Sequence, residues 1–235
     1  MRTIFILLVS VVAIVCTGCE VDDTELKNSK TYTLYEDISA LVISDGVDVI
    51  VDDALPHDQV YALTNANNFK RLSVEVNDGT LHIGGVSISI FGYNRCLVYV
   101  PSVAYERVAL KGGSDFLWDN CNSDVLSVSV SGGGDCQINS CNSDVLSISV
   151  SGGGDCQIKG VTQQLSIDSS GGADVKCGEL EAKDVTINAS GGSDIDAVAN
   201  STLSLTASGG VDVHIKGNPQ IVHWDISGGA DVEFN

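Results

Sequence analysis

Hydrophobic and polar residues alternate in short runs throughout the second half of the chain. In residues 126–130 (LSVSV), one leucine and two valines are separated by serines, so every second side chain is apolar. This two-residue period is typical of a β-strand with one buried face. The same alternation returns in later segments, at residues 146–150, 165–167, 185–187, 203–205 and 224–226.

Each of these strands leads into one short glycine-rich phrase, which occurs seven times as Gly-Gly-x-Asp. The glycine pairs are Gly112 and Gly113, Gly132 and Gly133, Gly152 and Gly153, Gly171 and Gly172, Gly191 and Gly192, Gly209 and Gly210, and Gly228 and Gly229. The aspartates are Asp115, Asp135, Asp155, Asp174, Asp194, Asp212 and Asp231, separated by 20, 20, 19, 20, 18 and 19 residues.

A nearly constant period of this length predicts a solenoid, in which each repeat is one coil stacked on the next. Two strands within about 19 residues leave no room for a crossover helix, so the strands of successive coils must stack in parallel. The expected fold is all-β, a single-stranded, right-handed parallel β-helix with about 19–20 residues per coil. Regular coils are expected over residues 111–235 and an irregular β part over residues 32–110. Within that part, Asn77-Asp78-Gly79 predicts a tight hairpin turn.

The N-terminus has the features of a bacterial lipoprotein signal. Arg2 precedes a short apolar run that ends in Gly18-Cys19, which predicts a signal peptide over residues 1–18 and lipid attached to Cys19. Residues 19–31 are acidic and polar, as expected of a flexible tether that holds the body away from a membrane. The acidic cluster also resembles the export signal of surface lipoproteins in the Bacteroidetes. We therefore expect an outer-membrane lipoprotein of the cell envelope, exposed at the cell surface.

Charge and cysteine spacing exclude some classes of partner. A formal net charge of −19 argues against nucleic acid, which needs Lys and Arg to neutralise phosphate. The six cysteines after Cys19 contain no C-x-x-C pair, which argues against a zinc site. Residues 121–138 and 141–158 are nearly identical, so Cys121 should stack on Cys141 and Cys136 on Cys156. We expect buried free thiols on the strands, and a disulfide between Cys121 and Cys141 at the turn.

The glycine-rich phrase has a structural explanation and a functional one. Glycines allow positive φ and close backbone approach, and an aspartate can accept hydrogen bonds from N–H groups that a turn leaves bare. Because the residue after each Asp is apolar, the carboxylates must lie outside the core. Seven stacked carboxylates would repel one another, and a cation such as calcium could bind between them. We expect no cofactor, with this aspartate ladder as the candidate calcium site.

The chain resembles the putative auto-transporter adhesin, head GIN domain family of exported Bacteroidetes proteins. The resemblance rests on Ile43–Val51 (ISDGVDVIV), Leu72–Ile83 (LSVEVNDGTLHI), the strand that ends in Pro101, and the serial Ser-Gly-Gly-x-Asp phrases. Family members frequently have Ser-Gly-Ser-Gly at the position of Ser-Gly-Gly. The resemblance implies a parallel β-helix and an adhesin role, and it supplies no catalytic residues.

The expected function is therefore a cell-surface adhesin-like or structural binding module, not an enzyme. The alternatives are a carbohydrate-active β-helix enzyme and a glycan-binding protein without catalysis, since parallel β-helices carry lyases and hydrolases. Such an enzyme needs paired carboxylates in a cleft, or a metal with a basic residue, and none of the four arginines lies in the repeats. The partners would be the membrane, through the lipid, and a protein or glycan ligand. A homodimer is also expected, because the last coil presents an open strand edge.

Overall fold

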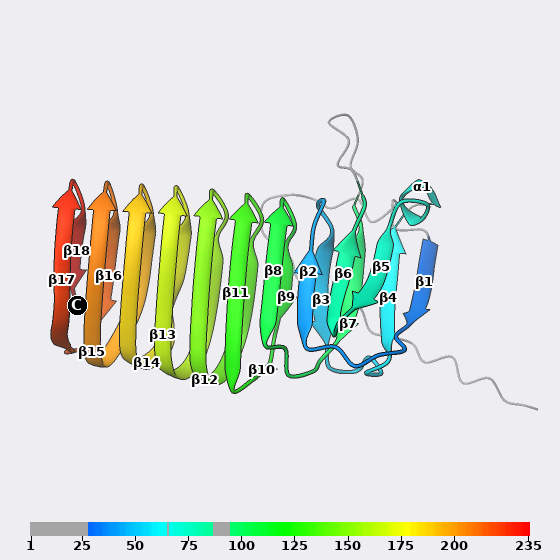
Figure 1. Cartoon of the computed structure of the whole chain (residues 1–235), viewed down its shortest axis with the longest axis horizontal. Coiled ribbons are helices and arrows are strands. Elements are labelled where there is room, and N and C mark those ends of the chain that lie inside the picture. The colour runs from blue at the N-terminus through cyan, green and yellow to red at the C-terminus, as the bar shows by residue number, and fades with distance from the viewer. Residues whose placement is uncertain (1–27, 65, 87–94) are drawn as a thin grey trace, which may run out of the picture.

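The computed structural model of the chain describes residues 28–64, 66–86 and 95–235. These residues form an elongated, nearly all-β stack in which the strands belong to one continuous sheet wound around a single core (Figure 1). The strands of neighbouring coils pair in parallel throughout the regular part. The predicted β-solenoid is confirmed.

The elements of the N-terminal part are β1 (Asn28–Thr33), β2 (Ala40–Ile43), β3 (Asp48–Asp52), β4 (Gln59–Thr64), the one-turn helix α1 (Ala66–Phe69), β5 (Ser73–Asn77), β6 (Thr80–Gly84) and β7 (Leu97–Pro101). Those of the regular part are β8 (Arg107–Gly112), β9 (Phe116–Trp118), β10 (Cys121–Asn122), β11 (Val125–Gly132), β12 (Cys136–Gly152), β13 (Cys156–Gly171), β14 (Asp174–Gly191), β15 (Asp194–Gly209), β16 (Asp212–Lys216), β17 (Gln220–Gly228) and β18 (Asp231–Phe234).

The first glycine of each Gly-Gly-x-Asp phrase forms a corner at which the coils stack backbone on backbone. Its φ lies between 76° and 111° in all seven copies, a region that residues with a Cβ rarely adopt. From the second coil on, the N–H of the second glycine donates to the carbonyl of the first glycine one coil earlier, over 2.7–2.9 Å. The hydrogen-bond ladder therefore runs unbroken around the corner.

The second turn of the coil absorbs the variation in repeat length. Cys136 pairs with Cys156, 20 residues on, but Cys141 pairs with Gly160, 19 residues on, with a register shift between them. The next two interfaces also shift only in this region, and each returns to an unshifted run that ends at the corner glycines. Irregular spacing in the sequence thus leaves the corner in register.

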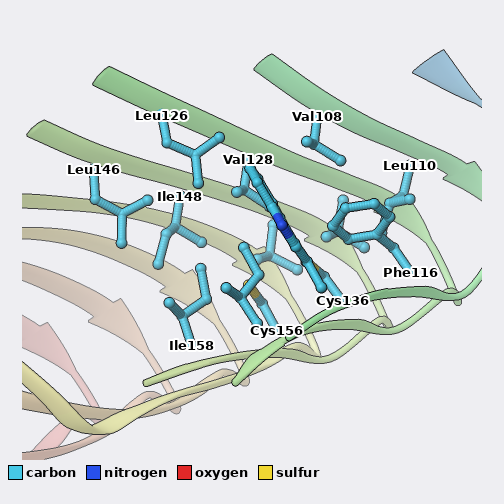
Figure 2. Close-up of a cluster of buried hydrophobic side chains, with 14 of the residues drawn as sticks. Val108, Leu110, Phe116, Leu126, Val128, Cys136, Leu146, Ile148, Cys156 and Ile158 are labelled. Carbon is cyan, nitrogen blue, oxygen red and sulfur yellow. The ribbon is translucent and has the colours of Figure 1, made fainter. Parts of the chain in front are cut away.

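Side chains inside the stack form rows of similar residues. Figure 2 shows Leu126 beside Leu146 and Val128 beside Ile148, as the parallel register requires. The two inward positions around the corner compensate each other in volume. Where the residue before the corner shrinks from Val130 and Val150 to Ser169, Ala189 and Ala207, the residue before the aspartate grows from Gly134 and Gly154 to Ala173, Ser193 and Val211. Filling the core at nearly constant volume explains why some phrases have a third glycine.

The first coils do not stack in the order of the sequence. Strands β2 and β3 pair with β6 and β7 on one side and with β8 and β9 on the other. The coil at residues 40–52 therefore lies between two coils that follow it in the chain. The phrase SDGVDV within this coil forms a corner of its own, with Asp45 at φ 62° and Gly46 at φ 73°.

Antiparallel strands cover the N-terminal end of the stack. Strand β4 pairs antiparallel with β7 and also with β1, and β5 pairs antiparallel with β6. The β5–β6 connection turns at Asp78 (φ 49°) and Gly79 (φ 70°), which confirms the hairpin predicted at this site. The outer strand β1 is almost entirely polar and contains Lys30, features that protect a sheet edge from further pairing.

We predict that Gly152→Ala destabilises the protein by about 2 kcal/mol or more, because the backbone there has φ +108° and a Cβ would lie 2.5 Å from the Gly132 carbonyl oxygen. The control is Gly153→Ala, where a Cβ would have no neighbour within 4 Å. Urea unfolding followed by circular dichroism measures both variants. An equal loss in the two variants would show that the stacked corner is not what requires glycine.

Candidate functional site

Two outward faces of the solenoid differ in chemistry. The hydroxyl face is formed by the side chains that point outward from β11 to β15 on the strand before each corner. All but Asp168 and Asn188 are serine or threonine, and the members are Ser127, Ser129, Ser131, Ser147, Ser149, Ser151, Ser166, Ser170, Thr186, Ser190, Ser204, Thr206 and Ser208. These positions are half-buried or exposed.

The hydroxyl face is a regular lattice of small polar groups. Equivalent residues on neighbouring strands are about 4.8 Å apart, and successive outward residues of one strand about 6.7 Å apart. In the described part of the chain, the hydroxyls of Ser127, Ser129, Ser147 and Ser149 make no hydrogen bond with protein atoms. Such groups can donate to and accept from an external ligand.

The acidic face lies on the strand after each corner. Its first row is the predicted ladder of seven aspartates, which the register brings together outside the core. Asp48 extends this ladder by one rung, because Val49 pairs with Phe116. The next outward row contains Gln137, Gln157 and Lys176, and ends in Asp196, His214 and Glu233.

Local hydrogen bonds and two basic residues offset the repulsion within the ladder. Asp115 Oδ1 accepts the backbone N–H of Asp135 at 3.0 Å, and Asp135 Oδ1 accepts that of Asp155 at 3.3 Å. Lys176 Nζ lies 3.5 Å from Asp155 Oδ2 and 3.1 Å from Asp174 Oδ2, and its pairing with Asp174 raises the lysine pKa. Beyond these rungs, the aspartate N–H groups donate to backbone carbonyls instead.

Asp48 is the most perturbed carboxylate of the ladder. Burial, followed by the charge of Asp115, raises the pKa of Asp48 to about 6, although Arg95 Nε lies 3.7 Å from its Oδ2. Burial also raises the pKa of Asp115. Sequence reasoning missed the roles of Arg95 and Lys176. The aspartate in SDGVDV was the signal for Asp48, but its coil lies out of sequence order.

The cysteines stack as the repeat predicts. Cys121 and Cys141 are buried, pair in register, and have their Sγ atoms 3.8 Å apart as free thiols. Cys136 and Cys156 also pair in register within the core, where Figure 2 shows them among Phe116 and Ile158. The structure therefore places the predicted pair for a disulfide at neighbouring positions.

No arrangement for metal-dependent or paired-carboxylate chemistry is found in the described residues. They contain no group of three or more His, Cys, Asp or Glu side chains that could hold a metal ion. Calcium at the aspartate ladder remains a prediction of the sequence. A shallow groove of about 390 Å³ at the N-terminal end is lined by Tyr32–Glu36, Val74 and Val76, with Glu36 as its one carboxylate. Paired carboxylates of the glycosidase kind are therefore not present in this groove.

The remaining predicted positions divide into core, end and undescribed residues. Trp118 is buried in the core with Tyr105 and Phe116 around it, whereas Trp224 lies in the last coil. Cys19 and the signal peptide lie outside the described residues. Within the described ranges, no helix has the length and apolar character needed to cross a membrane.

The family comparison covers most of the chain. Residues 37–219 match the family described as putative auto-transporter adhesin, head GIN domain. The chain belongs to this family. The match includes the out-of-order coil, the hydroxyl face and most of the aspartate ladder. A search of curated proteins finds no match.

Solved structures share the fold at low sequence identity. A putative adhesin from Bacteroides fragilis has a TM-score of 0.81 at 18% identity, with 88% of this chain and 96% of that chain covered. A structure described as a putative lipid binding protein, from Parabacteroides distasonis, has a TM-score of 0.68 at 18% identity, with 90% and 98% covered. A putative adhesin from Parabacteroides merdae has a TM-score of 0.62 at 18% identity, with 88% and 95% covered. These matches establish a common fold.

We predict that Asp48→Asn changes the pH dependence of stability. Because the folded pKa of Asp48 is raised to about 6, the unfolded chain loses this proton first as the pH rises. The contribution of Asp48 to stability therefore falls between about pH 4 and pH 6 and then stays constant. An uncharged amide at this position removes the loss, so the variant should exceed wild type by roughly 2–3 kcal/mol at pH 7 and match it near pH 4. Urea unfolding at both pH values measures the difference, and a difference independent of pH would contradict the assignment.

We predict that oxidation of the folded protein links Cys121 to Cys141. Oxidised glutathione would accept the two electrons and two protons that the thiols lose, and the bond should stabilise the fold by up to roughly 3 kcal/mol. Peptide mapping by mass spectrometry identifies the linked pair, and Cys121→Ser is the control. A Cys136–Cys156 link in its place, or free thiols after prolonged oxidation, would refute the prediction.

Proposed function

We propose that this protein is a surface-anchored adhesin module that binds an extended polar ligand through the hydroxyl face, without catalysis. The observation that carries the proposal is the regular lattice of outward Ser and Thr side chains on β11–β15. A flat face suits a polymer or a macromolecular surface, whereas a small molecule needs a concave pocket. Family membership and the adhesin descriptions of similar structures support this class of function.

Repetition would supply the affinity that each single group lacks. A hydrogen bond to one serine contributes only about 1 kcal/mol after its water is displaced. Equivalent contacts repeated on five neighbouring strands reinforce one another when the ligand is also extended, because each later contact is intramolecular. The face contains Asn188 bonded to Asp168 over 2.9 Å, so its few longer polar side chains are ordered as well.

The ligand class is a polar protein or glycan surface. The acidic face would repel anionic polymers, whereas the hydroxyl face has few charges and can approach them. Glycan-binding platforms usually use rows of exposed aromatic rings, and the described outward rows of β11–β15 contain none. Hydrogen bonding over the lattice is therefore the proposed mode of binding.

The anchor would orient the body on the cell. Lipid attached to Cys19 would hold the chain in the outer membrane, and residues 19–31 would act as the tether. Strand β1 lies at one end of the stack and β17 and β18 at the other (Figure 1). The C-terminal coil would then be the part farthest from the anchored end.

The test is adhesion of cells that display the full chain to mucin-coated plates. Ser129→Gln with Ser149→Gln should reduce the number of bound cells by about tenfold, because two bulky side chains disrupt the lattice in adjacent coils. The reverse exchange, Gln137→Ser with Gln157→Ser on the acidic face, should leave adhesion unchanged.

Melting temperatures show that both double variants are folded, and antibody labelling of intact cells shows that they reach the surface. Equal adhesion by wild type and by the hydroxyl-face variant would refute this face as the binding site. Failure of labelling on intact cells would refute the surface location.

A further inference from the structure

The C-terminal coil exposes the inside of the solenoid. Strands β17 and β18 pair with β15 and β16 on one side and have no strand on the other side among the described residues. Inward positions that are buried in earlier coils are open here, with Ile221 42%, Trp224 45% and Phe234 48% exposed. The rings of Trp224 and Phe234 stack with centroids 6.0 Å apart, so they span the open core from β17 to β18.

The edge of β17 lacks the features that prevent strand pairing. Lysine, proline or inward charges protect most exposed edges, and Lys30 on β1 does so at the other end of this stack. The nine residues of β17 (QIVHWDISG) contain no lysine or proline, and Val222, in its bulge, is 58% exposed. An apolar strand edge of this length requires a partner strand.

We propose that the C-terminal coil is a self-association surface, occupied by the same coil of a second copy in a two-fold, end-to-end pair. A two-fold axis at Trp224 would pair β17 antiparallel with itself, since an isologous interface repeats one surface on both subunits. In that register, His223 lies opposite Asp225 of the partner subunit, and Asp225 opposite the partner's His223. Shifting the register by two residues would instead place Asp225 opposite the partner's Asp225 or His223 opposite the partner's His223.

The N-terminal segment of the same chain is a poor candidate for this surface. The registers place ten inter-strand steps between β1 and β18, a distance of about 48 Å. After cleavage at Cys19, nine residues precede Asn28, and fully extended they span at most about 32 Å. The tether therefore falls short of β17.

End-to-end pairing would place the two anchored ends at opposite tips of a rod of double length. This consequence depends on the anchoring proposed above. Copies in one membrane would have to bend back to meet, whereas copies on two facing cells could pair directly. The structure thus favours homophilic contact between cells as the use of this surface.

The first test is the mass of the purified full-length chain, measured in detergent by sedimentation equilibrium over a hundredfold range of concentration. Wild type should be a dimer, and Ile221→Lys with Trp224→Lys should be a monomer with an unchanged circular dichroism spectrum. The matched control is Val125→Lys with Val161→Lys, which replaces two apolar residues of similar exposure in the middle of the stack and should remain dimeric. A monomeric wild type, or a dimer that survives the Ile221 and Trp224 substitutions, would overturn the proposal.

The second test is a charge exchange within β17. His223→Asp alone places Asp opposite the partner's Asp225 at both pairs and should weaken the dimer by about tenfold. Adding Asp225→His reverses both pairs and should restore the wild-type dissociation constant. A dimer that is insensitive to the single change, or not restored by the double change, would overturn the two-fold register.

These outcomes are independent of the adhesion assay. A dimer without binding to mucin would support the self-association surface and refute the proposed ligand face. Mucin binding by a strictly monomeric protein would do the reverse. Clumping of displaying cells that is lost with Ile221→Lys and Trp224→Lys, and kept with the Val125 and Val161 control, would support pairing between cells. Clumping unaffected by the Ile221 and Trp224 substitutions would exclude it.

Discussion

The stack depends on one hydrogen bond repeated at every corner, from the second glycine N–H to the carbonyl of the first glycine one coil earlier. It continues the sheet through a bend where a chain would normally lose its ladder. Because the first glycine has no Cβ, neighbouring backbones can approach closely enough to form this bond. Each coil then re-enters the next strand in the same phase, so outward and inward residues stay aligned whatever happens at the second turn. The hydroxyl face and the aspartate ladder both result from this alignment.

Local patterns predicted the regular coils well. The two-residue period identifies inward rows such as Val128 with Ile148, and the spacing of the aspartates identifies the stacking partners, because both signals lie within one repeat. The order of the first coils could not be predicted. Residues 40–52 stack between coils formed about 40 and 60 residues later, and no local signal encodes which later strand a strand will meet. For the same reason Asp48, Arg95 and Asp115 could not be placed together from the sequence.

The two ends of the stack are treated differently, and this difference complements the two faces. Antiparallel strands and polar residues close the end near β1, whereas aromatic and branched apolar side chains remain open at β17 and β18. Along the body, charge is concentrated on one face and hydroxyl groups on another. An adhesin of this design would have a lateral surface for an extended ligand and a terminal surface for its own kind. Neither surface needs a pocket or a metal.

The most direct test of this account is amide hydrogen exchange at the second glycines of the corners. Gly133, Gly153, Gly172, Gly192 and Gly210 are at an exposed bend, where amides normally exchange within the time of a local opening. If the corner ladder holds the coils together, NMR should show these amides to be as protected as those of the strands on either side. Rapid exchange at these glycines, with the flanking strands still protected, would show that the corners follow the stacking and do not set it.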